Sequence, residues 1–485
     1  MSRRADNARL KALHADLSQA TTYQAWQQVA AEVDAHTGAA DWRADDNSPH
    51  LDGPRLRTDI DQMARLQTSG DAESLARLLH GSLHETIGDL THAPLYDAAL
   101  TGTKRVIDDY MDAIEGALTW LAATPNLPLA HKQTLIEQAD QVHGRPALLL
   151  SGGATLGFYH IGVVKALWAA GLLPEVMCGA SMGAMVAAGI ATRTEDELAE
   201  LWSHPEQLRR FGLQWTGLAQ ARKQGGLFNP AVMRQTIRHN VGHWTFKQAH
   251  ERTGRVLNIS VSPTRAGQSP RLLSHLTAPD VLVCQSALAS GAIPVAFPPV
   301  TLLALDADGQ EVPYLPGERW MDGSMHGDLP KMRLARLHNV NRFIVSQTNP
   351  HVLPFLGLRG QRGLLPLATR VLAKSAWSQS QQTFQLAAKL AEPTPLHSWV
   401  DLAAHVTRQE WRGDIDIHPP FRWRLYRRVF SNPTASDLDL FILDGQRATW
   451  PRLETIRQHT RLSRMLQATR QQLATPPAPH SLQAR

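Results

Sequence analysis

Cysteine is scarce in this chain: Cys178 and Cys284 are the only two among 485 residues. Two cysteines cannot form the disulfide scaffold on which small secreted domains depend, so we expect a reduced, cytoplasmic protein. The N-terminus lacks the apolar segment of a signal peptide, and no uncharged apolar run approaches the roughly 18 residues of a membrane span. We therefore expect a soluble protein, or one bound peripherally to a membrane or lipid particle.

Patterns typical of nucleic-acid recognition are also lacking. No helix-turn-helix, zinc or RNA-recognition pattern accompanies the basic residues, so nucleic acid is not expected as a partner. The net charge changes from −8 over residues 1–145 to +9 over residues 351–485. Residues 422–428 alternate arginines with aromatic side chains, which suits an anionic lipid surface. The alternative is a solvated face that pairs with the acidic N-terminal region.

Composition and periodicity predict three segments. Residues 1–145 are expected to form a helical N-terminal domain of unknown function, since apolar residues recur at helical spacing, as at Val106, Tyr110, Ile114 and Leu118. Residues 146–350 are expected to form a catalytic α/β domain. Residues 351–485 are expected to form a basic, mainly helical extension, with helices near 364–390 and 450–473 and a strand near 413–417.

The middle segment alternates short apolar strands with helices. The strands are expected near residues 147–150, 174–178, 256–261 and 342–347. Strands that alternate with helices are typical of a parallel sheet, in which functional residues lie at the carboxyl ends of the strands.

Glycine-rich turns follow the first two of these strands. Residues 179–183 form a G-x-S-x-G elbow, in which Gly179 and Gly183 flank Ser181. A nucleophilic serine needs such a sharp turn, where glycines let strand and helix approach closely. The turn at residues 151–157 offers backbone N–H donors for the oxyanion that forms when a serine attacks an ester. The two turns predict an acyl hydrolase with Ser181 as its nucleophile.

The first turn has an alternative interpretation as a phosphate-binding loop, because glycine turns between strand and helix also hold anions. Gly157 is followed by Phe158 and Tyr159, where a P-loop has lysine and then serine or threonine. The G-x-G-x-x-G spacing of a dinucleotide site is absent. The pattern therefore favours oxyanion binding.

Asp322, which precedes Gly323, is the candidate base for Ser181. Asp-Gly is also a strong hairpin-turn signal, and it recurs at residues 308–309 and 444–445, so the dipeptide alone decides nothing. A serine–aspartate–histidine triad is the alternative, with its base among His326, His338 and His351. An H-x4-D spacing typical of glycerolipid acyltransferases begins at His275, but a chain with 22 histidines produces such a match by chance.

These motifs together resemble the patatin-like phospholipases and lipases. The similar segments are residues 151–157 with 160–164, 179–183, 289–294 with 297–300, and 322–323. The resemblance implies a patatin-like three-layer α/β fold and a serine–aspartate dyad without histidine, carried by Ser181 and Asp322. The resemblance implies no metal and no organic cofactor.

The flanking segments resemble one branch of that family. Residues 23–26, 41–43, 95–96 and 102–104 are similar to the uncharacterised domain that precedes the patatin core in fungal and plant lipid-droplet triacylglycerol lipases. The chain departs from patatins proper in lacking arginine or lysine in the glycine turn. The backbone N–H groups of Gly153 and Ala154 are therefore the expected oxyanion donors, together with that of Gly152.

The function implied by the resemblance is hydrolysis of long-chain acylglycerol esters in lipid catabolism, as in a triacylglycerol lipase. Ser181 would attack the ester carbonyl and Asp322 would accept its proton. Three alternatives stay open: a phospholipase A or lysophospholipase with the same dyad, an acyltransferase, and a non-catalytic protein of lipid surfaces. The sequence does not fix the oligomeric state.

Overall fold

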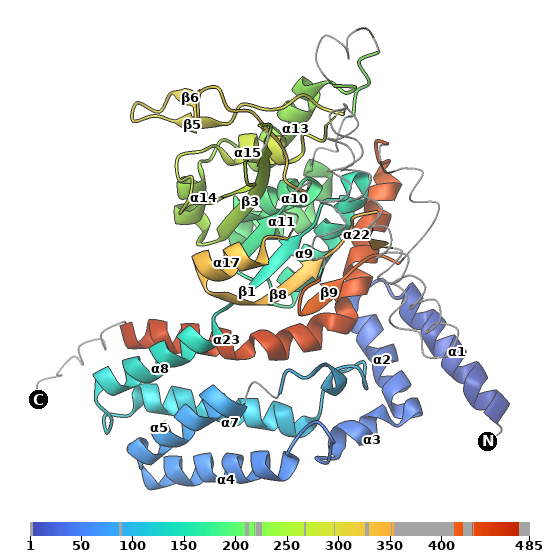
Figure 1. Cartoon of the computed structure of the whole chain (residues 1–485). Coiled ribbons are helices and arrows are strands. Elements are labelled where there is room, and N and C mark those ends of the chain that lie inside the picture. Colours follow the sequence, from blue (N-terminus) through green and yellow to red (C-terminus); the bar gives the residue numbers. More distant parts are fainter. Residues whose placement is uncertain are drawn as a thin grey trace, which may run out of the picture. The chain divides into compact units, whose positions relative to one another are not determined.

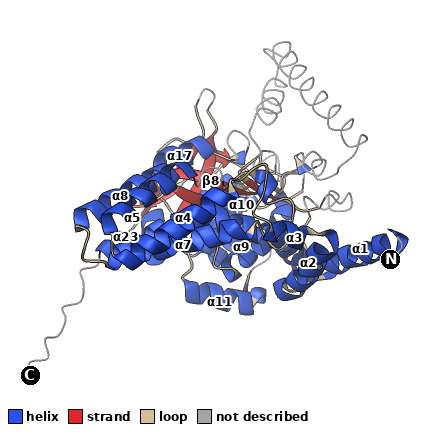
Figure 2. Cartoon of the chain, turned by 90° about the horizontal axis from the view of Figure 1, so that it is seen from below, coloured by secondary structure: helices blue, strands red, loops and turns tan. Residues whose placement is uncertain are grey.

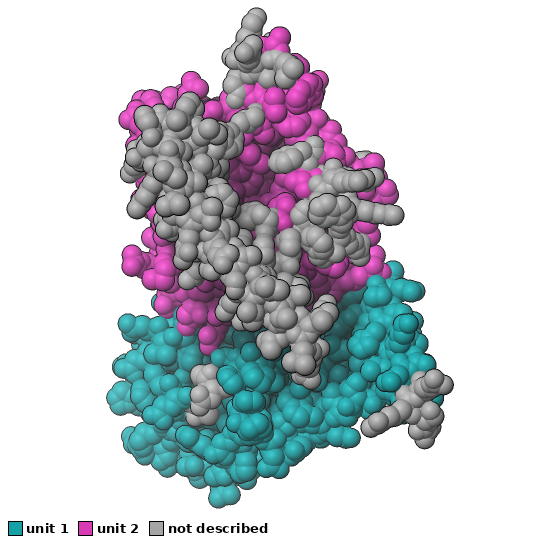
Figure 3. Space-filling model, turned by 45° about the vertical axis from the view of Figure 1, so that its right-hand side comes forward, with its two compact units in different colours: residues 1–146, 450–485 teal, residues 147–449 magenta. Residues whose placement is uncertain are grey.

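The computed structural model describes residues 3–86, 90–208, 213–217, 219, 226–265, 268–294, 296–324, 329–350, 352–353, 412–420, 429 and 431–474. The chain divides into two compact units, residues 1–146 with 450–485 and residues 147–449, which Figure 3 colours separately. This grouping differs from the three predicted segments, because the end of the chain belongs with the N-terminal unit. The predicted helix at 364–390 lies outside the described residues.

The first unit is helical. Its longer helices are α1 (Arg3–Gln19), α2 (Tyr23–Thr37), α3 (Ala39–Ala44), α4 (Gly53–Ser69), α5 (Ala72–Gly81), α7 (Arg105–Ala123), α8 (Leu129–His143) and α23 (Leu453–Ala474) (Figure 1). Aspartates start two of them: Asp52 Oδ1 accepts from the Arg55 amide at 3.1 Å, and Asp71 Oδ1 accepts from the Ser74 amide at 3.0 Å. Each carboxylate satisfies an amide that has no partner within its helix.

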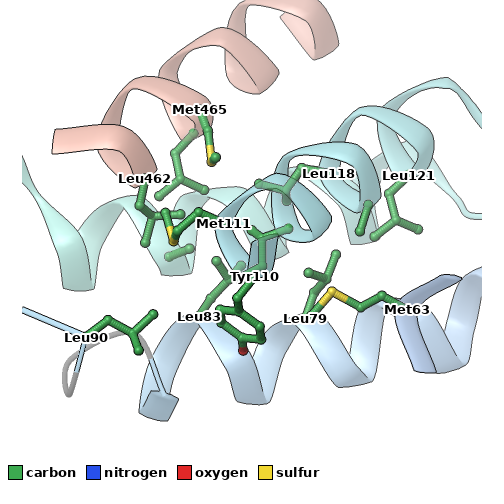
Figure 4. Close-up of a cluster of buried hydrophobic side chains, with 14 of the residues drawn as sticks. Met63, Leu79, Leu83, Leu90, Tyr110, Met111, Leu118, Leu121, Leu462 and Met465 are labelled. Carbon is green, nitrogen blue, oxygen red and sulfur yellow. The ribbon is translucent and has the colours of Figure 1, made fainter. Parts of the chain in front are cut away.

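Apolar side chains from several helices form the core of this unit (Figure 4). The helical face predicted in α7 is confirmed, because its four residues are at most 1% exposed: Val106, Tyr110, Ile114 and Leu118. Leu462 and Leu466 of α23 are buried in the same core. Their burial explains why the last helix groups with a segment more than 300 positions earlier in the chain.

The second unit is built on a seven-stranded sheet (Figures 1 and 2). The strand order is β4-β3-β2-β1-β8-β9, and β7 also pairs with β3. The pairs β1–β2, β2–β3 and β8–β9 are parallel, while β4 and β7 run antiparallel to β3. The strands are β1 (Arg145–Leu150), β2 (Val176–Gly179), β3 (Val256–Pro263), β4 (Arg271–Leu273), β7 (Trp320–Asp322), β8 (Val340–Ser346) and β9 (Ile415–Ile417). This mostly parallel sheet confirms the predicted α/β class.

Helices surround this sheet, and α10, α14, α15 and α17 contact its strands directly, as expected for strands that are buried on both faces. Among the described residues, the α-helices of this unit are α9 (Tyr159–Ala169), α10 (Met182–Ala191), α11 (Glu195–Ser203), α13 (Pro230–Val241), α14 (Phe246–Thr253), α15 (Val283–Ser290), α17 (Lys331–His338) and α22 (Ala435–Thr449). Two glycines let α9 and α22 approach closely, because a Cβ on Gly445 would lie 2.9 Å from the Cα of Gly162.

A separate hairpin joins β5 (Leu303–Leu305) to β6 (Glu311–Pro313). Its turn contains Asp308 and Gly309, and Gly309 has φ 75°, so this Asp-Gly pair serves as a turn. Cys178 and Cys284 are both buried, and no disulfide joins them. In the described part of the chain, no helix combines the length and apolar character needed to cross a bilayer.

Candidate active site

Ser181 lies in a sharp turn between β2 and α10. Its backbone has φ 54° and ψ −123°, a conformation that non-glycine residues rarely adopt. The flanking glycines are required by space: a Cβ on Gly179 would overlap the Gly183 carbonyl oxygen, and a Cβ on Gly183 would overlap the Leu150 carbonyl oxygen. The G-x-S-x-G segment thus adopts the strained elbow that its pattern predicts.

A buried serine from another helix holds this elbow. The Ser181 amide donates to Ser290 Oγ at 2.9 Å, and Ser290 Oγ donates to the Ser260 carbonyl oxygen at 2.7 Å. Ser290 ends α15 and is 0% exposed. It therefore links the elbow to strand β3, a function that the sequence pattern alone does not reveal.

The first glycine turn lies directly against Ser181. A Cβ on Gly152 would be 3.3 Å from Ser181 Cβ and 3.1 Å from Ser324 Cβ, so only glycine gives the chain this spacing without displacement. Ala154 has φ 46°, which turns the backbone after Gly153. Within the described residues, the N–H groups of Gly153 and Ala154 donate to no protein acceptor. They are available to bind an oxyanion.

The buried side chains of His160 and Thr348 contact the backbone of the glycine turn. His160 Nε2 lies 3.0 Å from the Ser151 carbonyl oxygen, and its Nδ1 lies 2.7 Å from Ser346 Oγ. Thr348 Oγ1 donates to the Gly152 carbonyl oxygen at 3.0 Å. Burial lowers the pKa of His160 to about 4, so this imidazole is neutral at physiological pH. His160 lies in the segment at 160–164 that resembles the family, but the sequence does not predict its contacts with Ser151 and Ser346.

Asp322 ends β7 and is 1% exposed. Its Oδ1 accepts from both the amide and the hydroxyl of Ser324, each at 2.7 Å. Its Oδ2 is buried and accepts no hydrogen bond in the structure as described. Gly323 is required next to it, because a Cβ there would overlap the Ser260 carbonyl oxygen.

Burial dominates the electrostatics of this carboxylate. Desolvation raises the pKa of Asp322 to about 6, while the Ser181 hydroxyl and the Ser324 hydroxyl and amide act in the opposite direction. Ser181 and Asp322 lie in one cluster. A Cβ on Gly152 would contact both Ser181 and Ser324, and the Ser324 hydroxyl donates to Asp322 Oδ1. A carboxyl group with a pKa near 6 can take up and release a proton near neutral pH.

An apolar cavity opens beside Ser181 and contains about 490 Å³ of space, part of which is open solvent. It is lined by side chains that include Met182, Met185, Phe228 and Phe297. Its lining among the described residues contains no charged side chain. The surface next to the nucleophile therefore suits a hydrocarbon chain.

The histidines proposed as alternative bases lie elsewhere or outside the described residues. His338, at the end of α17, has its Nε2 2.9 Å from Asn258 Oδ1 on β3. His275, which begins the H-x4-D spacing and was not among those bases, stacks on His250 with ring centroids 4.0 Å apart. His326 and His351 lie outside the described residues. Across the described ranges, no group of three or more metal-ligating side chains is present.

Comparison with protein families identifies both parts of the chain. The model of the patatin-like phospholipase family matches residues 148–333, and a domain of unknown function, DUF3336, matches residues 3–141. Both matches confirm the predicted resemblance. VipD from Legionella pneumophila, a solved structure, aligns with 64% of this chain and 67% of its own at a TM-score of 0.30 and 14% identity.

Two relatives are named as lipases. The chain is 31% identical to triacylglycerol lipase ptl3 of Schizosaccharomyces pombe, over 93% of this chain and 95% of the relative. It is 30% identical to triacylglycerol lipase SDP1L of Arabidopsis thaliana, over 90% of this chain, but it spans only 56% of that longer protein. The chain belongs to the patatin-like phospholipase family, and like that family it is a carboxylic ester hydrolase.

Proposed function

We propose that the chain is a lipase that cleaves long-chain acylglycerols, including triacylglycerol, through a dyad of Ser181 and Asp322. The observation that carries this proposal is the buried Asp322 carboxylate beside the strained nucleophile elbow. The Ser181 hydroxyl lowers its pKa, and within the described residues its Oδ2 accepts no hydrogen bond. The names of the two lipase relatives support acylglycerol as the substrate class.

In the proposed mechanism, Ser181 Oγ attacks the ester carbonyl carbon as its proton moves to Asp322 Oδ2. The N–H groups of Gly153 and Ala154 stabilise the oxyanion, assisted by that of Gly152. Asp322 then gives the proton to the leaving alcohol, and the acyl group stays on Ser181. A water molecule that loses its proton to Asp322 releases the fatty acid, and the proton returns to Ser181.

The lining of the cavity favours a neutral ester over a phospholipid. A phosphate group gains from cationic partners, and none is present among the described residues of this cavity. The deciding experiment compares triolein, phosphatidylcholine and lysophosphatidylcholine, with Ser181→Ala as control. Fastest release of fatty acid from triolein supports the proposal. Faster release from either phospholipid would assign a phospholipase activity instead.

We further propose that the enzyme acts at a membrane or lipid-particle surface. The proposal rests on the alternation of arginines and aromatic residues at 422–428, which lie outside the described residues, and on the net charge of +9 over residues 351–485. Basic residues near an anionic surface each gain about 1 kcal/mol, and this attraction decreases with salt.

A further inference from the structure

A second apolar cavity adjoins the one beside Ser181, because the two share lining residues. It contains about 630 Å³ of space, part of which is open solvent, and is lined by residues of α9, α10, α11, α13 and α22. The catalytic mechanism makes no use of it.

One face of α10 connects the two cavities. Met182 and Met185 line both of them, and Val186, Gly189 and Ile190 continue along the second. These positions follow the three- and four-residue spacing of a single helix face. At a rise of about 1.5 Å per residue, the stretch from Met182 to Ile190 spans roughly 12 Å. The stripe begins next to Ser181 and leads away from it.

The partition between the cavities consists of side chains that can move. Phe158, Met182 and Met185 are the residues shared by both linings. The Met185 Cε packs against Gly291, where a Cβ would overlap it. Methionine has three rotatable bonds and adapts to irregular apolar spaces, so a rotamer change at Met185 can join the cavities.

Polar groups close the far end. Arg193 Nη1 donates to the Asn240 carbonyl oxygen at 2.7 Å and also to the Gly189 carbonyl oxygen. Both Arg193 and Asn240 line the second cavity. An apolar passage that begins at the nucleophile and ends at a hydrogen-bonded arginine has the form of a site for one long hydrocarbon chain of limited length.

We propose that the second cavity is the distal half of the acyl-chain site. The acyl chain of the scissile ester passes Ser181, crosses between Phe158 and Met185, and ends near Arg193. This proposal rests on the proposed lipase function and adds to it the determinant of acyl-chain length. Each methylene group that loses its place in an apolar site lowers kcat/KM about fourfold.

Gly189→Leu is the test. A Cβ at Gly189 would lie 3.6 Å from Arg193 Nη1 and 3.7 Å from the Asn240 carbonyl oxygen, so the Cβ itself meets no clash. Because Gly189 lines the second cavity, we expect the rest of the leucine side chain to occupy it. Gly116→Leu is the matched control, because it makes the same change in helix α7, where no atom lies within 4 Å of the added Cβ. The readout is the ratio of kcat/KM for p-nitrophenyl palmitate to that for p-nitrophenyl butyrate.

We expect Gly189→Leu to lower this ratio at least tenfold and Gly116→Leu to retain the parent ratio. An unchanged ratio in Gly189→Leu would overturn the distal site while leaving the lipase function intact. A parent protein that cleaves neither ester would overturn the proposed function itself.

A binding measurement distinguishes a folding defect in the variant from a blocked acyl-chain site. In the Ser181→Ala background, palmitate should raise the melting temperature, because a ligand bound to the folded state stabilises it. Adding Gly189→Leu should remove this rise. If Gly189→Leu does not fold, Ile237→Phe fills the same cavity from α13 and should have the same effect. If palmitate still raises the melting temperature of a folded Gly189→Leu or Ile237→Phe variant, the proposal is contradicted.

Discussion

Replacing Asp322 with asparagine should abolish ester hydrolysis and also stabilise the protein. Asparagine has nearly the same shape, and its amide oxygen can still accept from the Ser324 amide and hydroxyl, as Asp322 Oδ1 does at 2.7 Å. It cannot accept the proton of Ser181. The same substitution removes a buried charge, so activity and stability should change in opposite directions.

The magnitude follows from the pKa of Asp322, which burial raises from 3.8 to about 6. Above pH 6 the carboxyl group is ionised in both folded and unfolded chains, and the folded state is destabilised by roughly 3 kcal/mol. Below pH 3.8 the group is protonated in both states, and this destabilisation disappears. Asparagine leaves an N–H group without a partner at a cost of about 1 kcal/mol. The net gain in the free energy of unfolding should be about 2 kcal/mol at pH 8.

Urea unfolding at pH 8 and pH 5 measures this effect. The advantage of Asp322→Asn over the parent should be clear at pH 8 and smaller at pH 5, because pH 5 lies within the titration window of 3.8 to about 6. Asp308→Asn, in the exposed β5–β6 turn, is the control and should change stability little at either pH. A variant less stable than the parent at pH 8, or an advantage that does not depend on pH, would refute the burial argument.

The remaining predictions concern the support of the site and its lipid surface. Ser290→Ala leaves the buried Ser181 amide without its acceptor. We therefore expect kcat to fall about tenfold with little change in KM, and the free energy of unfolding to fall by roughly 1 to 3 kcal/mol. Equal changes in kcat and KM would contradict a positioning function. His338→Ala loses the contact with Asn258 but should keep most of the esterase activity, and a complete loss would favour the triad. Reversing the four arginines of residues 422–428 to glutamate should weaken salt-sensitive binding to anionic liposomes and lower activity on emulsified triolein more than on a soluble short-chain ester; equal losses on both substrates would assign those residues to folding.

Local pattern was sufficient to predict the elements that carry the elbow. The run of apolar residues at 147–150, the glycines at 179 and 183, and the small residues after Ser181 each specify a strand, a turn or a helix start, and β1, β2 and α10 lie where these patterns place them. The sheet class followed from the alternation of strands and helices.

Contacts between segments that are distant along the chain cannot be predicted from the sequence pattern. The hydrogen bond from Ser181 to Ser290 joins residues 109 positions apart, and that from Thr348 to Gly152 joins residues 196 positions apart. No periodicity encodes such pairs, because they depend on how strands are ordered in the sheet. For the same reason the sequence does not predict that α23 groups with the N-terminal helices, although its periodicity predicts a helix there.

The Asp-Gly pairs illustrate the same limit. Asp308-Gly309 forms a hairpin turn, Asp444-Gly445 lies inside α22, and Asp322-Gly323 ends a buried strand. The dipeptide is identical in all three, and only the fold distinguishes a solvated turn from a buried carboxylate beside the nucleophile.

Labelling with a fluorophosphonate probe, followed by peptide mapping in a mass spectrometer, tests the central claim most directly. The probe modifies a serine only where a base and an oxyanion site activate it. We expect a single modified residue, Ser181, in the parent protein, no modification in Ser181→Ala, and strongly slowed modification in Asp322→Asn. Modification of another serine, or undiminished labelling of Asp322→Asn, would contradict the serine–aspartate dyad.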